Sequence, residues 1–277
     1  MKIVICATTF PPALGGLENV AEMTADALGR GGDAVTVLTR TAGPEMPERA
    51  YRLVRSPSFF SALRECRTAD AAVMVNVGLK ILSPLLASRT PFAIWHQTLH
   101  IGAHADRRTT LPDRIKDQVV RRLATRNLGC SDYVTATLPG SRTKSTVANP
   151  YDPARMFEEP GVTRDGDLVF VGRLVSDKGV DVILRAMALP PLAFARLTIV
   201  GQGPERSSLG ALAAELGLAD RVRFVGARTG AELRRTFAAH RVLVVPSVWE
   251  EPFGIVALEG LACGCEVVVA RSGGLPE

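Results

Sequence analysis

Short apolar runs alternate with amphipathic stretches along the whole chain. The runs are rich in Val, Ile and Ala and end in turn residues, which is typical of buried parallel strands. We expect strands at 2–7, 33–39, 51–55, 69–76, 91–95 and 132–137, and then at 167–171, 196–200, 221–225, 241–245 and 266–270. Because helical stretches separate most of these runs, the rhythm predicts parallel sheets with helices on both faces.

The stretches between the strands show the apolar spacing of helices. We expect helices at 17–30, 180–189, about 209–216 and 229–239, and one after Pro252 that stops at Gly264. Thr229 is the expected N-cap of its helix, because a hydroxyl there accepts a hydrogen bond from a free backbone N–H. The opening strand, loop, helix and strand predict a Rossmann-like domain.

A polar segment rich in proline divides the chain. It begins at Asn149-Pro150-Tyr151-Asp152-Pro153 and runs to Asp167. Such a segment is typical of a turn and of a linker, and 277 residues are enough for two compact domains. We therefore predict an α/β fold with two Rossmann-like domains, at residues 1–150 and 151–277.

The positive charge is concentrated in one segment. The formal net charge is +5, and residues 107–126 contain seven Lys or Arg but only two Asp. Basic clusters bind phosphate-rich partners, here anionic lipid headgroups or a diphosphate substrate, and a solvated helix face explains the same pattern equally well. Nucleic acid is the least favoured partner, because an aromatic content of 5% leaves few rings for base stacking.

The composition favours a globular cytoplasmic protein. A hydrophobic content of 47% excludes disorder. The five cysteines are odd in number and form no C-x-x-C pair, so we expect reduced thiols and no zinc site. The first apolar run is too short for a signal peptide, and no run is long enough to span a bilayer. The basic segment at 107–126 also allows peripheral contact with the inner face of the membrane.

One loop in the second half has the composition of an anion site. Gly172, Arg173, Lys178 and Gly179 lie between an expected strand and an expected helix. Arginine can hold two phosphate oxygens in a fork, lysine adds a point charge, and the helix start offers N–H groups. The loop is not a P-loop, because G-x-x-x-x-G-K-[ST] is absent. The alternative is a charged surface loop.

A second loop places two glutamates around a helix start. Glu251 precedes the helix and Glu259 lies inside it. Ligands bind at the carboxyl ends of parallel strands, where this loop lies, and a carboxylate can accept two hydroxyl hydrogen bonds from a sugar diol. The N–H groups of Phe253, Gly254 and Ile255 could hold further oxygens. Solvated surface carboxylates and a glycosidase acid pair are the alternatives.

Two features of the first half carry weaker signals. Gly15-Gly16 precedes a helix and permits close approach of an anion, although an ordinary tight loop has the same composition. A nicotinamide dinucleotide is disfavoured, because G-x-G-x-x-G is absent. Trp95-His96 ends an expected strand at the edge where ligands bind.

Three histidines follow one another at four-residue intervals: His96, His100 and His104. This spacing could place metal ligands on one helix face. A metal is disfavoured, because H-E-x-x-H is absent and Gly102 would weaken such a helix. Surface or hydrogen-bonded histidines are the simpler interpretation.

Several strings in register resemble one enzyme family. Glu-Pro-Phe-Gly-Ile-Val-Ala-Leu-Glu at 251–259 resembles the E-x7-E signature of retaining, nucleotide-sugar-dependent glycosyltransferases of family 4, the group 1 type. Gly-Arg-Leu-x-x-x-Lys-Gly at 172–179, Pro-Pro-x-x-Gly-Gly-x-Glu at 11–18, the Trp-His pair and Asn-Pro-Tyr-Asp at 149–152 resemble further elements of that family. The resemblance covers nearly all of the second half in order, and the first half at its opening loop and His96.

This resemblance implies the GT-B arrangement, two Rossmann-like domains facing a cleft, with the acceptor side at 1–150 and the donor side at 151–277. It implies that Arg173 and Lys178 bind the donor diphosphate and stabilise it as it leaves. Glu251 would hold sugar hydroxyls, Glu259 the ribose, and His96 would contact the transferred sugar.

The resemblance also implies that Gly15, Gly16 and Gly172 lie beside the donor, together with the backbone of Phe253, Gly254 and Ile255. No metal or other cofactor is expected, because two cations can meet the charge of the leaving group.

The expected function is transfer of a sugar from a UDP- or GDP-sugar to an acceptor hydroxyl, with retention, in the synthesis of a glycan, a glycolipid or a glycosylated metabolite. Family members continue past the Gly-Gly-x-Pro-Glu element at 273–277 with more helices, so the resemblance implies an incomplete C-terminal domain. The alternative is a non-catalytic or partner-dependent nucleotide-sugar-binding protein. A nucleotide-sugar epimerase is disfavoured by the E-x7-E string.

Overall fold

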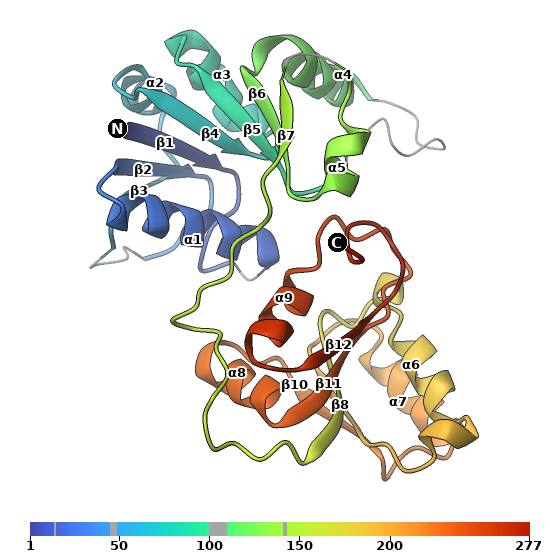
Figure 1. Cartoon of the computed structure of the whole chain (residues 1–277). Helices are drawn as coiled ribbons and strands as arrows, with labels where there is room; N and C mark the ends of the chain where they lie inside the picture. The colour runs from blue at the N-terminus through green and yellow to red at the C-terminus, as the bar shows by residue number, and fades with distance from the viewer. Residues whose placement is uncertain (14, 45–48, 100–109, 141–142) are drawn as a thin grey trace. The chain divides into compact units, whose positions relative to one another are not determined.

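The structure is a computed structural model that describes residues 1–13, 15–44, 49–99, 110–140 and 143–277. The chain forms two compact units, Met1–Pro150 and Tyr151–Glu277. The boundary lies within the segment rich in proline. Figure 1 labels the helices and strands of both units, and each unit is described by itself below.

The first unit is built on a parallel sheet with the strand order β3-β2-β1-β4-β5-β6-β7. Its strands are β1 (Lys2–Ala7), β2 (Ala34–Thr39), β3 (Tyr51–Arg55), β4 (Ala71–Val75), β5 (Phe92–His96), β6 (Arg126–Gly129) and β7 (Lys144–Thr146). Its described helices are α1 (Gly16–Arg30), α2 (Phe59–Arg67), α3 (Leu79–Ser88), α4 (Leu111–Gln118), which continues as a π-helical turn at Val119–Leu123, and α5 (Asp132–Thr137).

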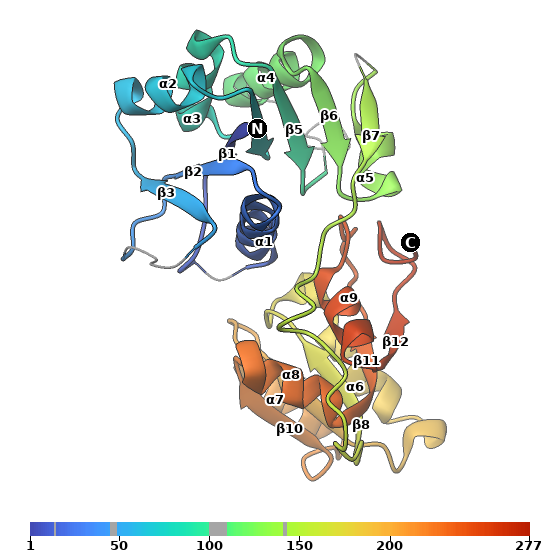
Figure 2. The ribbon, with the colours of Figure 1, turned by 60° about the vertical axis from the view of Figure 1, so that its left-hand side comes forward.

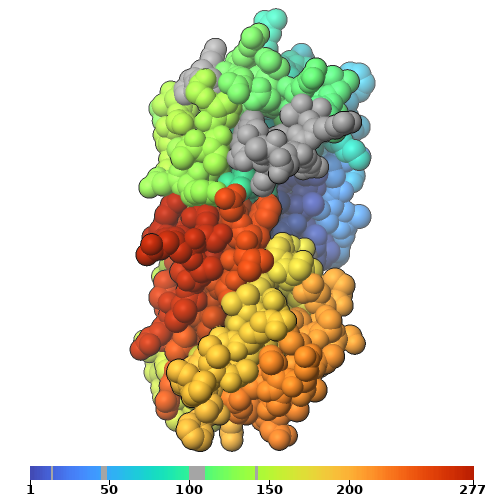
Figure 3. Space-filling model, turned by 90° about the vertical axis from the view of Figure 1, so that its right-hand side faces the viewer, coloured from blue at the N-terminus to red at the C-terminus, as the bar shows by residue number. Residues whose placement is uncertain are grey.

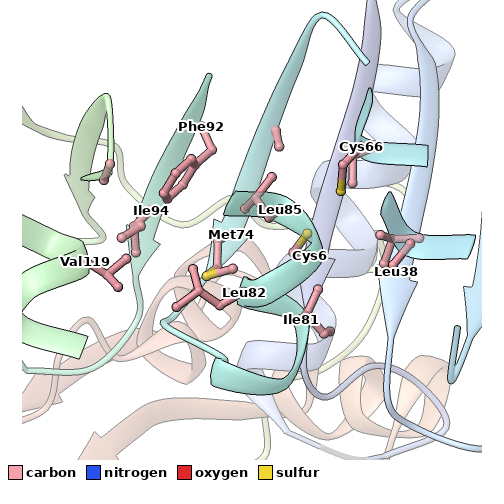
Figure 4. Packing of buried hydrophobic residues seen from close by; sticks show 14 of the residues in the cluster. Cys6, Leu38, Cys66, Met74, Ile81, Leu82, Leu85, Phe92, Ile94 and Val119 are labelled. Atoms are coloured by element: carbon pink, nitrogen blue, oxygen red, sulfur yellow. The ribbon is translucent and has the colours of Figure 1, made fainter. Parts of the chain in front are cut away.

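Helices cover both faces of this sheet because successive strand residues point to opposite sides. In β1, Val4 and Cys6 face a core that α2 and α3 complete. Ile5 and Ala7 face the opposite core, which α1 completes. Figure 4 shows the first of these cores, with side chains of α3 packed over the strands. All five cysteines lie in the described residues, are buried, and form no disulfide.

The second unit repeats the plan on a smaller parallel sheet with the order β10-β9-β8-β11-β12. Its strands are β8 (Gly166–Val171), β9 (Leu197–Val200), β10 (Val222–Gly226), β11 (His240–Val245) and β12 (Glu266–Val269). Its described helices are α6 (Val180–Met187), α7 (Arg206–Glu215), α8 (Gly230–Ala238) and α9 (Ile255–Ala262). One core contains α6 and α7 and the other contains α8 and α9, so helices again cover both faces (Figure 2).

The expected fold class, α/β with two Rossmann-like domains, is confirmed. The expected strands agree with the observed ones within two residues at each end, apart from one. Thr229 lies at the N-cap position of α8, as expected, but its side chain makes no capping hydrogen bond there.

The prediction of a strand at 132–137 is wrong, because these residues form helix α5. Ser131 begins the helix as its N-cap, and its hydroxyl accepts a hydrogen bond from the Val134 N–H at 3.1 Å. Asp132 adds a negative charge in the first turn, where its interaction with the helix dipole stabilises the helix. Capping therefore outweighs the β-propensity of the Val and Thr residues.

Candidate functional site

The two loops singled out in the second half leave neighbouring strands of one sheet. β8 and β11 pair in parallel, with Leu168 opposite Val242. The loop of residues 172–179 follows β8, and the loop of residues 246–254 follows β11. Because the carboxyl ends of parallel strands meet at one edge, both loops emerge side by side at the edge where ligands bind. In the space-filling view the yellow segment after β8 lies against the orange-red segment after β11 (Figure 3).

Backbone contacts join these loops into one element. The N–H groups of Val248 and Trp249 donate hydrogen bonds to the Asp177 carbonyl at 3.0 and 3.3 Å. Gly179 has φ +65, and a Cβ there would lie 2.3 Å from the Pro246 carbonyl oxygen. Only glycine permits this conformation and this close approach without strain.

At the centre of the paired loops, Lys178 and Glu251 form a salt bridge through Nζ and Oε1. The same oxygen accepts a hydrogen bond from the Ser247 hydroxyl at 2.7 Å. Glu251 is 9% exposed and Ser247 only 2%. The structure thus brings together two of the predicted residues, from loops that are far apart in sequence.

Residues 272–274 contact the backbone around Glu251. The Gly274 N–H donates to the Glu251 carbonyl at 2.7 Å. Gly273 has φ +59, and a Cβ there would lie 2.1 Å from the same carbonyl oxygen. The Ser272 hydroxyl also donates to the Trp249 carbonyl at 2.9 Å. Neighbouring residues therefore hold both the backbone and the carboxylate of Glu251.

Helix α9 begins without a side-chain cap. Its N-cap is Gly254, with φ +89. Among the described residues, the N–H groups of Phe253, Gly254 and Ile255 have no hydrogen-bond partner. Uncapped N–H groups at a helix start favour an anion or a hydroxyl oxygen. These donors lie on the same loop as Glu251.

Glu259 lies on α9 in a different environment from Glu251. Burial raises the pKa of Glu259 to about 7. Its carboxyl group has no hydrogen-bond or salt-bridge partner within the described chain. A carboxyl group of this kind gains most from ligand hydroxyls that donate to it.

Arg173 and Gly172 begin the loop after β8. The Gly172 N–H donates to the Val200 carbonyl at 3.0 Å, and Gly201 leaves room for the Gly172 carbonyl, which would lie 1.8 Å from a Cβ at 201. Arg173 is exposed and has no ion-pair partner in the part of the chain that the structure describes. Its guanidinium can therefore accept an anionic ligand without breaking a bond.

His96, Gly15 and Gly16 belong to the first unit. Gly15 and Gly16 are exposed at the start of α1, which has no side-chain cap. His96 ends β5 and is 5% exposed, with its Nε2 at 3.0 Å from Asn127 Oδ1. Asn127 uses its amide nitrogen to donate to the Val120 carbonyl at 2.8 Å, so its oxygen accepts from His96. Nε2 of His96 is therefore the donor in this hydrogen bond.

His96 also lines a cavity of about 220 Å³. Three other residues with polar side chains, Asn76, Thr98 and Lys116, line the same cavity. The predicted histidine therefore combines a structural hydrogen bond with access to a space large enough for a small polar group.

Residues 154–277 match the family described as glycosyl transferases group 1. The matched residues make up nearly all of the second unit, so this unit is similar to the glycosyl transferases of group 1. Both loops of the candidate site, with Arg173, Lys178, Glu251 and Glu259, lie inside the matched region.

Curated relatives agree with this assignment. The chain is 40% identical over 156 residues to a D-inositol 3-phosphate glycosyltransferase of Frankia alni, a match covering 52% of this chain and 38% of that protein. It is 37% identical over 193 residues to the D-inositol 3-phosphate glycosyltransferase of Saccharomonospora viridis, covering 64% and 42%. An uncharacterized glycosyltransferase of Methanocaldococcus jannaschii is 43% identical over 119 residues, covering 42% and 30%. The chain thus spans less than half of the length of these relatives.

Solved structures show the same fold. Anabaena HepE in complex with UDP and glucose matches with a TM-score of 0.77 and 20% identity, over 99% of this chain and 82% of that chain. WaaG, a glycosyltransferase involved in lipopolysaccharide biosynthesis, matches with a TM-score of 0.74 and 21% identity, over 99% and 82%. The fold of this chain is the GT-B class of two Rossmann-like domains.

Part of the predicted basic segment and of the histidine series lies outside the described residues: His100, His104, Arg107 and Arg108. In the described part, Arg121 forms an exposed ion pair with Asp117 at 2.7 Å. Asp113 completes a capping box with Thr110 at the start of α4. Both acidic residues of the segment therefore have local partners. Within the described chain, no helix is long and apolar enough to cross a membrane.

Sequence reasoning missed two residues that hold predicted site residues in place. Ser247 bonds Glu251, and Asn127 bonds His96 from a strand that follows 31 residues later. The position of Ser247, four residues before Glu251 in a tight loop, is a signal that could have identified it. No sequence signal connects Asn127 to His96.

Gly179→Ala tests whether the two loops form one element. The substitution places a methyl group against the Pro246 carbonyl, so we expect a loss of roughly 2–4 kcal/mol in the free energy of unfolding, measured by urea denaturation. Gly217→Ala is the matched control, since Gly217 has φ +68 but open space around it, and it should cost only about 1 kcal/mol. Equal losses in the two variants would show that the loops do not pack closely.

The pKa of Glu259, about 7 in the folded protein against an ordinary value of 4.5, predicts a pH-dependent stability. Between these two values the folded state binds more protons than the unfolded state, so the free energy of unfolding falls as pH rises, by roughly 3 kcal/mol in total. Glu259→Gln should remove this fall and should stabilise the protein more at pH 8 than at pH 5, relative to wild type. Urea denaturation at both pH values measures this difference, with Glu266→Gln, at an exposed position of β12, as the control. A stability difference that is the same at both pH values would contradict the burial of Glu259.

Proposed function

We propose that this chain transfers a sugar from a UDP- or GDP-sugar to an acceptor hydroxyl, with retention at the anomeric carbon. The product would be a glycan, a glycolipid or a glycosylated metabolite. One observation supports this most strongly: Lys178 and Glu251, from the loops after two neighbouring strands, meet in a unit that is similar to the glycosyl transferases of group 1. Around them lie donors and acceptors that have no partner within the described chain.

The diphosphate of the donor suits the loop after β8. Arg173 would hold two phosphate oxygens in a fork, and Lys178 would add a second positive charge. Both charges would meet the negative charge that develops on the leaving diphosphate, and such preorganised charges stabilise a transition state most effectively. Because two side chains supply this positive charge, we expect no metal and no other cofactor to be required.

The sugar and the ribose suit the loop after β11 and helix α9. Glu251 would accept hydrogen bonds from sugar hydroxyls, and the N–H groups of Phe253, Gly254 and Ile255 would donate to oxygens of the same donor. Glu259 would accept hydrogen bonds from the ribose hydroxyls. This division assigns a fixed carboxylate to the sugar and an unpartnered one to the nucleotide.

The first unit would supply the acceptor side. We assign Gly15 and Gly16, at the uncapped start of α1, to the donor diphosphate, and His96 to the transferred sugar.

The structure of Anabaena HepE contains UDP and glucose, which supports a UDP-sugar as the donor. The names of the D-inositol 3-phosphate glycosyltransferases support a hydroxyl group of a polyol as one acceptor class to test.

We also propose peripheral contact with anionic membrane at the cytoplasmic face. Arg121 and Arg122 are exposed beside exposed Leu123, and Leu111 and Ile115 are exposed on α4. Basic side chains beside exposed apolar ones favour an anionic bilayer surface.

The direct test of the proposed function is to incubate the purified chain with UDP-, GDP- and ADP-sugars, without added metal, and to follow the products by mass spectrometry. Release of one nucleoside diphosphate from one donor class supports the proposal. Binding without release would favour the alternative, a nucleotide-sugar-binding protein that needs a partner. Neither binding nor release with any donor would contradict both.

Arg173→Ala should lower kcat/KM for the active donor by a factor that corresponds to roughly 2–4 kcal/mol, because it removes a preorganised charge from the leaving group. Steady-state release of the nucleoside diphosphate measures this loss. Arg223→Ala, at an exposed position on β10, is the charge-matched control and should leave kcat/KM unchanged. Wild-type turnover in Arg173→Ala would exclude the leaving-group role.

Replacement of both Arg121 and Arg122 by Glu should weaken binding to vesicles that contain phosphatidylserine. Each basic residue near such a surface contributes roughly 1 kcal/mol to the binding free energy. Vesicle co-sedimentation at low and moderate salt measures the change. Reversal of Arg64 and Arg67, exposed on α2, is the control for net charge. If both double variants bind equally well, the basic segment is only a solvated face.

A further inference from the structure

The two oxygens of Glu251 have different surroundings. Oε1 contacts the Lys178 ammonium and accepts from the Ser247 hydroxyl. Among the described residues, Oε2 has no hydrogen-bond or ion-pair partner. It is not fully buried, so it retains contact with solvent. A carboxylate can accept on both oxygens, so the protein holds one and leaves the other for a ligand.

The Ser247 hydroxyl is itself fixed in position. Ser247 is 2% exposed, so its side chain has almost no freedom to turn toward water. On one side, Pro246 packs against Gly179, and on the other the Val248 N–H is bonded to the Asp177 carbonyl. The backbone on both sides of Ser247 is therefore attached to the loop that carries Lys178.

The two groups that hold Oε1 differ in what a ligand would do to them. The Lys178 ammonium is half-buried and sits on a flexible stem, so an arriving diphosphate would compete with Glu251 for it. The Ser247 hydroxyl is neutral and buried, so a phosphate does not draw it away. Once Lys178 turns toward a diphosphate, Ser247 is the side chain that still holds Oε1.

We propose that Ser247 is a positioning residue: its hydroxyl keeps Glu251 oriented, with Oε2 toward the sugar, while Lys178 is engaged by the donor diphosphate. This inference rests on the proposed function. It makes Ser247 important for recognition of the sugar and unimportant for recognition of the nucleoside diphosphate.

The experiment compares two affinities in the same full chain by isothermal titration calorimetry. The probes are UDP-glucose against UDP, and GDP-mannose against GDP. In Ser247→Ala the affinity for the sugar nucleotide should fall about 10-fold, the scale for losing a hydrogen bond to a charged group, while the affinity for the nucleoside diphosphate changes less than about twofold. Turnover should show the same split, with a lower kcat and a higher KM for the donor.

Two further variants separate positioning from packing. Ser247→Cys keeps the volume and replaces the hydroxyl by a weak donor, so it should behave like Ser247→Ala. Ser247→Thr keeps the hydroxyl and should restore most of the sugar-dependent affinity. Thermal melting of each variant reports whether the loops remain folded.

The outcomes distinguish this inference from the proposed function. If wild type prefers the sugar nucleotide and Ser247→Ala keeps that preference, the positioning role is wrong and the proposed function stands. If Ser247→Ala loses affinity for UDP and UDP-glucose in parallel, Ser247 only supports the fold, and the inference is overturned. If wild type binds none of the four probes, the proposed function fails and the inference fails with it.

Discussion

The candidate site is arranged around one interaction, the salt bridge between Lys178 and Glu251. A charge that leaves water loses solvation, and this loss is offset only where the partner is close and further hydrogen bonds are made. Ser247 supplies such a bond to the carboxylate. Two glycines, Gly179 and Gly273, let the neighbouring backbone approach closely enough to hold both partners. The loops after β8 and β11 are thus held together by this ion pair and by the backbone contacts around it.

The two glutamates of one motif have opposite environments. Glu251 is held by an ammonium and a hydroxyl, whereas burial raises the pKa of Glu259 to about 7 without any partner in the described chain. A fixed carboxylate offers a ligand a preorganised acceptor, and an unpartnered one gains stabilisation when hydroxyl groups arrive. This difference is the physical reason for the two roles that we propose, Glu251 binding the sugar and Glu259 binding the ribose.

Much of the fold follows from apolar runs, because buried parallel strands require them and turn residues end them. The helix at α5 was not predicted, since the capping by Ser131 is a local hydrogen bond that competes with the propensity of the following Val and Thr. The motifs predicted Lys178 and Glu251 separately, and their contact depends on the order of β8 and β11 in the sheet. The bonds from Ser247 and Asn127 depend on side-chain directions, which spacing alone does not specify.

The most direct test of the central claim is a crystal structure of this chain with UDP-glucose bound. The account predicts the diphosphate on Arg173 and Lys178, a sugar hydroxyl on Glu251 Oε2, and the ribose hydroxyls on Glu259. It also predicts that the Ser247 hydroxyl still donates to Glu251 Oε1 in the complex. A nucleotide bound away from the loops after β8 and β11, or a Glu251 carboxylate turned away from the sugar, would contradict it.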